Sequence, residues 1–214
     1  MQTDSLEKIT SFLHHMHAMK MALRYKGMPN WENTGIERWD SVAEHSYRMA
    51  LMALLYHPYI DEKPNLEKTL KMILVHDIVE LLANDFSPMR THDGAGGHAF
   101  DDQAYKTKFD RENDAAEKLF AELPTELGTE CVALWKEYAQ TKLIPNESTA
   151  EGRYAYALDK LEAEMQIVDW AGGGLWNSEK TEHSVAYTNE WTSYDPALSH
   201  VAQILGREMK NIEK

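Results

Sequence analysis

Five ionisable side chains interrupt stretches of sequence that are otherwise apolar at helical spacing. His76, Asp77 and Glu80 lie inside the run 73–83, whose other members are all apolar. His45 shares a helical stripe with apolar residues in an earlier segment, and Asp159 does so in a later one. A carboxylate buried without a partner is costly, so such groups usually have a cation or a dense set of hydrogen bonds. The pattern therefore indicates a cation in the interior.

The residue types favour a metal site that could support hydrolysis. His45, His76, Asp77 and Asp159 make a mixed nitrogen and oxygen ligand set from three segments that a helical bundle can bring together. Such a set suits Mn, Fe, Co, Ni, Zn or Mg and does not choose among them. It leaves positions for water and a substrate oxygen, and Glu80 is placed to act on that water. Taken singly, each histidine could be an ordinary core residue, and each acidic residue could cap a helix or pair with a basic one.

The elements that must position these residues are helices nearly throughout. Ser41 and Glu44 form a capping-box pattern, and Asp195 before Pro196 has the pattern of an N-cap followed by a first-turn proline. The segment 175–194 is ambiguous, and no period-two strand pattern or internal repeat is evident. We expect one all-α domain over 1–214, with a core of about 12–170 and a C-terminal helical extension over 171–214. The expected helices are 4–23, 42–57, 66–84, 101–122, 125–140, 149–170 and 196–212.

Composition narrows the class of protein further. The 214 residues carry 22 Lys and Arg against 35 Asp and Glu, a formal net charge of −13, which disfavours binding to duplex nucleic acid. The single cysteine, Cys131, excludes an internal disulfide and suits a reducing compartment. The first residues lack a signal-peptide pattern, and no apolar run approaches the ~20 residues of a spanning helix. We therefore expect a cytoplasmic protein that does not enter a membrane.

The spaced motif His45, His76-Asp77 and Asp159 resembles that of the HD-domain metal-dependent phosphohydrolases. Three further features make the resemblance specific: Glu80 three residues after the aspartate, the stretch 84–88 (Asn-Asp-Phe-Ser-Pro) and the stretch 158–162 (Leu-Asp-Lys-Leu-Glu). The resemblance covers about residues 12–170. Within that superfamily the sequence is most similar to the small bacterial 5′-deoxynucleotidases and their eukaryotic HD-domain relatives. This similarity implies the all-α HD fold.

The resemblance also implies roles for residues at matching positions. The two histidines and two aspartates of the motif correspond to the ligands of one divalent ion, with Asp77 also part of the catalytic machinery. Glu80 corresponds to the acidic residue that holds or deprotonates the attacking water. Arg24 corresponds to the arginine that orients the phosphate, a task suited to its planar fork. Arg38 and Arg48 are alternative phosphate contacts.

Substrate contacts are implied at four further positions. Asp85 corresponds to a residue that accepts a hydrogen bond from a sugar hydroxyl. Glu137 and Tyr138 fall near a segment that lines the nucleoside pocket. Tyr25 stands where the bacterial enzymes have a tryptophan that crowds a 2′-hydroxyl, so this departure leaves a deoxyribose preference open.

The expected activity is hydrolysis of (deoxy)nucleoside 5′-monophosphates to nucleoside and phosphate. The same fold acting on another phosphate ester, such as a nucleoside triphosphate or a signalling nucleotide, is the nearest alternative. A non-catalytic metal-binding module and a helical interaction protein without metal are further alternatives. A homodimer is also expected, with Trp176 and Trp191 as candidate interface residues unless they pack onto their own domain.

Overall fold

The structure is a computed structural model that describes residues 2–24, 40–84, 97–170 and 178–212. The described residues are helical apart from turns and one isolated bridge between Leu23 and Ser41, so the expected all-α class is confirmed. The helices are α1 (Gln2–His15), η1 (Met16–Lys20), α2 (Val42–Tyr56), η2 (His57–Tyr59), α3 (Leu66–Val75), α4 (Glu80–Ala83), α5 (Asp102–Phe120), α6 (Thr125–Leu143), η3 (Pro145–Glu147), α7 (Ala150–Trp170), α8 (Ser178–Thr192) and α9 (Pro196–Ile212).

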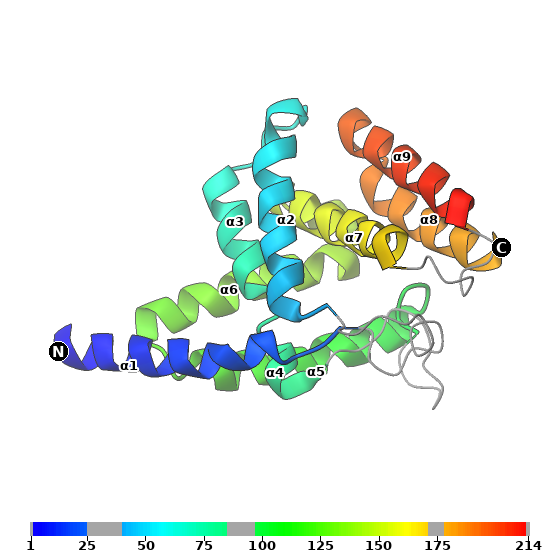
Figure 1. The fold of residues 1–214 in the computed structure, drawn as a ribbon. Coiled ribbons are helices and arrows are strands. Elements are labelled where there is room, and N and C mark those ends of the chain that lie inside the picture. The colour runs from blue at the N-terminus through cyan, green and yellow to red at the C-terminus, as the bar shows by residue number, and fades with distance from the viewer. Residues whose placement is uncertain (1, 25–39, 85–96, 171–177, 213–214) are drawn as a thin grey trace.

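Helix α7 is the centre of the bundle. It packs against α2, α3, α6, α8 and α9, while α5 pairs with α6 and α8 with α9 (Figure 1). Buried residues follow one another along most of α7, as expected for a helix with neighbours on nearly every side. Among the described residues, the largest fully buried side chains are Trp135, Tyr154, Tyr156, Phe120, Met49, Ile60, Met72, Ile73, Leu119, Leu158, Leu161 and Leu198.

Local sequence signals fix the starts of α2, α7 and α9. The Ser41 side chain accepts from the Glu44 amide, and the Glu44 carboxylate accepts from the Ser41 amide, so the predicted capping box is present. Thr149 Oγ1 accepts from the Gly152 amide at 3.0 Å, at the start of α7. Asp195 Oδ1 accepts from the Ala197 amide at 2.9 Å and caps α9 as predicted. The ambiguous segment contributes α8.

The expected continuous helix over 66–84 is wrong, because the chain leaves the helix after Val75 and begins α4 at Glu80. In the intervening turn the backbone bonds span three residues: the Glu80 amide donates to the Asp77 carbonyl at 3.1 Å. The Ile73 carbonyl instead accepts from His76 Nδ1 at 2.7 Å. A side chain thus replaces a helical partner, and the turn places His76 and Asp77 at the end of α3.

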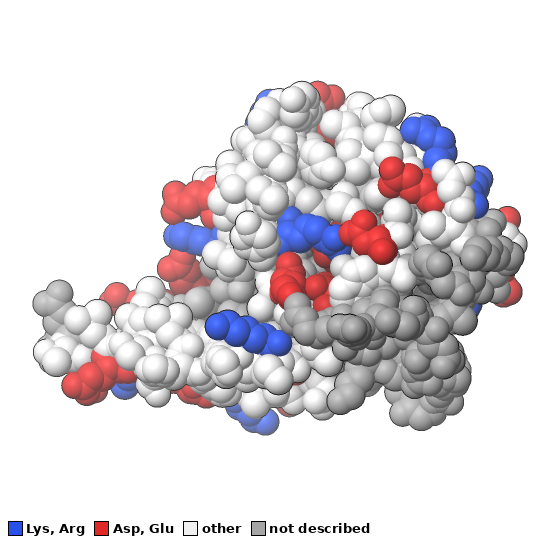
Figure 2. Space-filling model, viewed as in Figure 1, with Lys and Arg blue, Asp and Glu red and all other residues white. Residues whose placement is uncertain are grey.

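Acidic and basic side chains are interspersed on the face drawn in Figure 2, with both signs near its centre. No helix among the described residues is long and apolar enough to cross a bilayer. Trp191 is buried against Tyr156, with ring centroids 4.6 Å apart, so of the two alternatives left open for it, packing onto its own domain is the one observed. Trp176 lies outside the described residues.

Candidate metal centre

The structure brings all four expected metal ligands together where α2, the turn after α3, and α7 meet. His45 Nε2 of α2 lies 3.2 Å from Asp159 Oδ1 of α7 and 3.5 Å from Asp77 Oδ2. His76 Nε2 lies 3.1 Å from the same Asp77 oxygen. One donor atom each from His45, His76 and Asp159 falls within a 4.8 Å span. This is a compact set of two imidazoles and two carboxylates, of which His45, His76 and Asp159 are buried and Asp77 is partly exposed.

Each of the two imidazoles makes its hydrogen bond through Nδ1, which leaves the Nε2 atom to face the cluster. His76 Nδ1 donates to the Ile73 carbonyl, and His45 Nδ1 donates to the carboxylate of Glu162. Both Nε2 atoms are buried and make no hydrogen bond within the part of the chain that the structure describes. A histidine that binds a metal through one ring nitrogen typically donates from the other to a carbonyl or carboxylate. The residues therefore fit a divalent ion.

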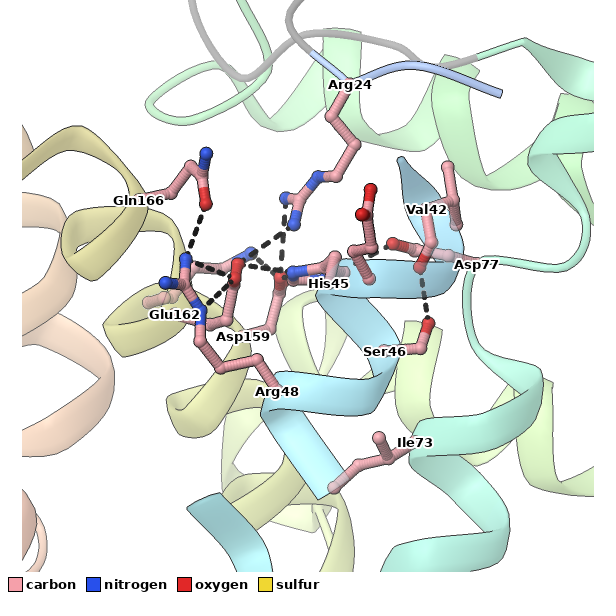
Figure 3. Close-up of polar contacts among 12 residues, drawn as sticks. Arg24, Val42, His45, Ser46, Arg48, Ile73, Asp77, Asp159, Glu162 and Gln166 are labelled. Carbon is pink, nitrogen blue, oxygen red and sulfur yellow. Dashed lines mark hydrogen bonds and ion pairs between the residues drawn. The ribbon is translucent and has the colours of Figure 1, made fainter. Parts of the chain in front are cut away.

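Glu162 ties the cluster to three basic side chains. Besides His45, it accepts from Arg24 Nη1 at 3.0 Å and from Arg48 Nε at 2.8 Å, and the basic groups converge on it in Figure 3. Glu162 was expected only as part of the motif 158–162, with no role of its own. A usable signal was present, because Glu162 follows Asp159 by three residues and so lies on the same face of a helix.

Electrostatics favours positive charge at the cluster. Burial alone would raise the pKa of Asp77, but His76 and His45 hold it well below its ordinary value. Burial would also raise the pKa of Glu162, which the neighbouring His45 and arginines hold at about 2. Burial and Arg24 act to lower the pKa of His45, yet Glu162 and Asp159 outweigh them and raise it to about 9. In the metal-free protein the His45 ring therefore keeps its second proton, which a bound metal would displace.

Comparison with known proteins decides the family. The family model described as "HD domain" matches residues 9–200, which include α8 and the start of α9. This chain belongs to the HD-domain family. Membership, together with the cluster, implies a divalent metal ion; its identity is not fixed by either.

Among curated proteins, the HD domain is similar to enzymes named 5′-deoxynucleotidase HDDC2. The protein from Xenopus laevis is 32% identical over 154 residues, covering 71% of this chain and 67% of that protein. The human protein is 29% identical over 140 residues, covering 65% of this chain and 59% of that protein. The chain thus spans about three fifths to two thirds of the length of these relatives.

Two solved structures resemble nearly the whole HD domain. A protein described as a predicted metal-dependent phosphohydrolase from Magnetospirillum magnetotacticum is 29% identical, with a TM-score of 0.69 over 97% of this chain and 96% of that one. The PH0347 protein from Pyrococcus horikoshii is 20% identical, with a TM-score of 0.66 over 93% of this chain and 99% of that one. The second shows the fold alone.

The two residues expected to act beside the metal both lie near the cluster of the HD domain. Arg24 Nη2 is 3.9 Å from Asp159 Oδ1, and its side chain is largely buried. Glu80 is buried at the start of α4, directly after the turn that carries His76 and Asp77. Their roles in orienting phosphate and activating water stay predictions.

Arg48, the alternative phosphate contact, is instead engaged within the protein. Besides Glu162, its guanidinium donates to Gln166 Oε1 at 2.5 Å and to Asp169 Oδ2 at 2.7 Å. These three acceptors lie along one side of α7, so Arg48 fastens α2 to α7. Arg38 lies outside the described residues.

The structure separates two neighbours that were expected in the nucleoside pocket. The Tyr138 hydroxyl donates to Asp159 Oδ2 at 2.8 Å, and its ring packs edge-on against His76 with centroids 4.8 Å apart. Glu137 points elsewhere: it accepts from Lys68 Nζ at 2.6 Å and lines a cavity of about 300 Å³ beside α6 and η3. None of the four cluster residues lines that cavity.

Tyr25 and Asp85, the other two expected substrate contacts, lie outside the described residues. Their roles therefore stay predictions from the resemblance.

Proposed function

We propose that the protein is an HD-type phosphohydrolase that converts (deoxy)nucleoside 5′-monophosphates to nucleoside and phosphate. The observation that carries this proposal is the cluster in which two buried imidazole Nε2 atoms, which make no hydrogen bond to any described residue, face two carboxylates beside an arginine. The names of the curated relatives support the substrate class.

The ligands we propose for the metal are His45, His76, Asp77 and Asp159. When bound, a divalent ion there supplies a Lewis acid that polarises a phosphoryl oxygen and acidifies water. Imidazole and carboxylate donors together suit Mn, Co, Fe, Ni, Zn or Mg. Glu162 contributes by fixing the orientation of the His45 ring, because it accepts the proton on Nδ1.

Arg24 and Glu80 are the groups that we assign to the phosphate and the water. The Arg24 guanidinium presents a planar fork of donors near Asp159, and such a fork matches two phosphate oxygens. Glu80 is buried at the start of α4, directly after the turn that carries His76 and Asp77, and we assign it to hold or accept a proton from the attacking water. Asp77 completes the site as a ligand that stays ionised, since its pKa is held low.

Nucleoside recognition is assigned to the remaining predicted residues. Asp85 would accept from a sugar hydroxyl, and Tyr25 would lie against the sugar. Tyr138 supports the site through Asp159, and Glu137 is retained as a prediction for the nucleoside pocket. Because tyrosine stands where the bacterial enzymes have tryptophan, we include both ribose and deoxyribose in the substrate range.

The test is phosphate release by purified protein treated with chelator and then supplied with Mn²⁺, Co²⁺ or Mg²⁺. We expect release from nucleoside 5′-monophosphates only with added metal, and loss of it in His76→Ala and Asp77→Ala. His14→Ala, which changes an exposed histidine of α1, is the matched control and should retain activity. Equal release with and without metal, or undiminished release by the cluster variants, would contradict the proposal.

Two finer expectations accompany the activity. We place the protein in a reducing compartment, the cytoplasm, because its one cysteine is free. We also propose a homodimer, which exposed apolar side chains on one face of α2 support, namely Tyr47, Leu51 and Leu55. A sedimentation measurement that finds only monomer at micromolar concentration would contradict the second expectation.

A further inference from the structure

Lys160 occupies an unusual position for a lysine, because its ammonium lies against the carboxylate of a proposed metal ligand. Its Nζ donates to Asp159 Oδ2 at 2.5 Å, and the side chain is only 13% exposed. The same Nζ lies 4.2 Å from the ring centroid of Tyr156 and 5.6 Å from that of Tyr187 on α8. A largely desolvated cation therefore stands between the metal cluster and two aromatic rings.

The two oxygens of Asp159 have different partners. Oδ1 faces His45 Nε2 at 3.2 Å, whereas Oδ2 accepts from both Lys160 and the Tyr138 hydroxyl. The Lys160 ammonium and the metal ion would thus contact opposite oxygens of the same carboxylate. Like charges so close repel, and this repulsion weakens metal binding. The Tyr138 hydroxyl could orient Oδ2 of Asp159 without repelling the metal. Orienting this metal ligand therefore does not explain why a lysine is present.

The Lys160 ammonium also has N–H donors left for a ligand. Lysine has three N–H donors, and within the described residues Lys160 Nζ donates only to Asp159. Lys142 provides the contrast, since its Nζ is 4.9 Å from the same Tyr187 ring. Lys142 donates to the carbonyls of His98 and Ala99 at 2.8 and 2.5 Å and lies 3.4 Å from the Tyr187 hydroxyl. Lys142 is thus partnered within the protein, and Lys160 retains donors.

We propose that Lys160 binds a non-bridging oxygen of the substrate phosphate. Arg24 approaches Oδ1 of Asp159 and Lys160 approaches Oδ2, so two cations flank one carboxylate at the edge of the site. A dianionic phosphate placed there offsets the repulsion between the ammonium and the metal and supplies acceptors for the remaining donors. The inference rests on the proposed function, because it assumes a phosphate ester as substrate.

The experiment measures binding of inorganic phosphate to Mn²⁺-loaded protein by calorimetry, and Mn²⁺ binding to the metal-free protein. Lys160→Met should weaken phosphate binding about 10- to 100-fold, the range for a charge-assisted hydrogen bond, and raise KM by a similar factor. Mn²⁺ affinity should be unchanged or higher, because a repelling charge is removed. Lys160→Arg should retain most phosphate affinity. Lys142→Met is the matched control, with phosphate affinity as in the wild type.

Two results would overturn the proposal. One is phosphate affinity in Lys160→Met equal to that of the wild type. The other is weaker Mn²⁺ binding with phosphate affinity retained, which would make Lys160 a partner of Asp159 alone. If Lys160→Met does not fold, Lys160→Gln gives the same comparison. If phosphate binding depends on Lys160 but no nucleotide is hydrolysed, the inference stands and the proposed function fails.

Discussion

Glu164 is a carboxylic acid buried between α7 and α8, and it should make the stability of the protein depend on pH. The residue is 1% exposed, and Ser184 Oγ lies 3.4 Å from its Oε1. Burial raises the pKa of Glu164 to about 7, against the weaker effect of hydrogen bonds from Thr188 and Ser184. The perturbation that isolates this effect is Glu164→Gln, which keeps the shape of the side chain and removes its charge.

The magnitude follows from the two pKa values. The difference between about 7 in the folded chain and 4.5 in the unfolded chain corresponds to about 3 kcal/mol, at 1.36 kcal/mol per pH unit. Below the unfolded value both states are protonated and the residue has no effect. Between the two values the unfolded chain loses its proton first, so the free energy of unfolding falls as pH rises. Above the folded value the full loss is present, because the folded chain then contains a buried carboxylate.

The assay is urea denaturation of the wild type and Glu164→Gln at several pH values between 4.5 and 8. The variant should match the wild type at the acid end and exceed it by about 3 kcal/mol at pH 8. Glu182→Gln, which changes an exposed glutamate of α8, is the control and should differ little at any pH. A difference between Glu164→Gln and the wild type that does not change with pH would refute the argument.

Two further substitutions test the site and the packing. Glu162→Gln removes the charge that fixes the ring of His45, so Mn²⁺ affinity measured by chelator competition should fall about 10- to 100-fold. Asp169→Asn is the control and should change Mn²⁺ affinity little. Equal Mn²⁺ affinities in the two variants would contradict the role given to Glu162. Gly128→Ala would place a Cβ 2.4 Å from the carbonyl oxygen at the end of α5, so thermal unfolding should show a loss of about 1–3 kcal/mol. Gly206→Ala meets only a valine side chain, at 3.3 Å, and a loss as large as that of Gly128→Ala would contradict the packing argument.

The sequence allowed prediction of the fold class and of the four clustered residues because both depend on local patterns. Ser41 and Asp195 cap the helices that follow them, so these caps are readable from neighbouring residues alone. The cluster was detectable because histidine and aspartate are rare on apolar helical faces. The structure then supplied the juxtaposition of His45 with Asp159, residues more than a hundred positions apart, at 3.2 Å.

The remaining features depended on contacts that no local pattern encodes. The helix breaks after Val75 because the His76 ring donates a hydrogen bond to the Ile73 carbonyl. The spacing of apolar residues is the same with or without that bond, so it could not predict the break. The hydrogen bond from the Tyr138 hydroxyl to Asp159 was not predicted, and the expected nucleoside contact of Tyr138 stays a prediction. Trp191 was a candidate for an interface, yet it packs against Tyr156. For Tyr138 and Trp191 the partner comes from another helix, whose approach is set by the packing of the whole bundle.

The contacts of Glu162 indicate that assembly of the fold and formation of the metal site are one event. A carboxylate without exposed surface is tolerated only because His45 and Arg48 of α2, and Arg24 after η1, all reach it. If α2 moved away from α7, Glu162 would lose its two partners on α2, His45 and Arg48, and His45 would lose both its orientation and its neighbour Asp159 at the same time. The free energy that favours docking of α2 onto α7 therefore also favours the geometry of the metal ligands. A variant in which this docking is weakened should lose metal affinity before it loses helix content.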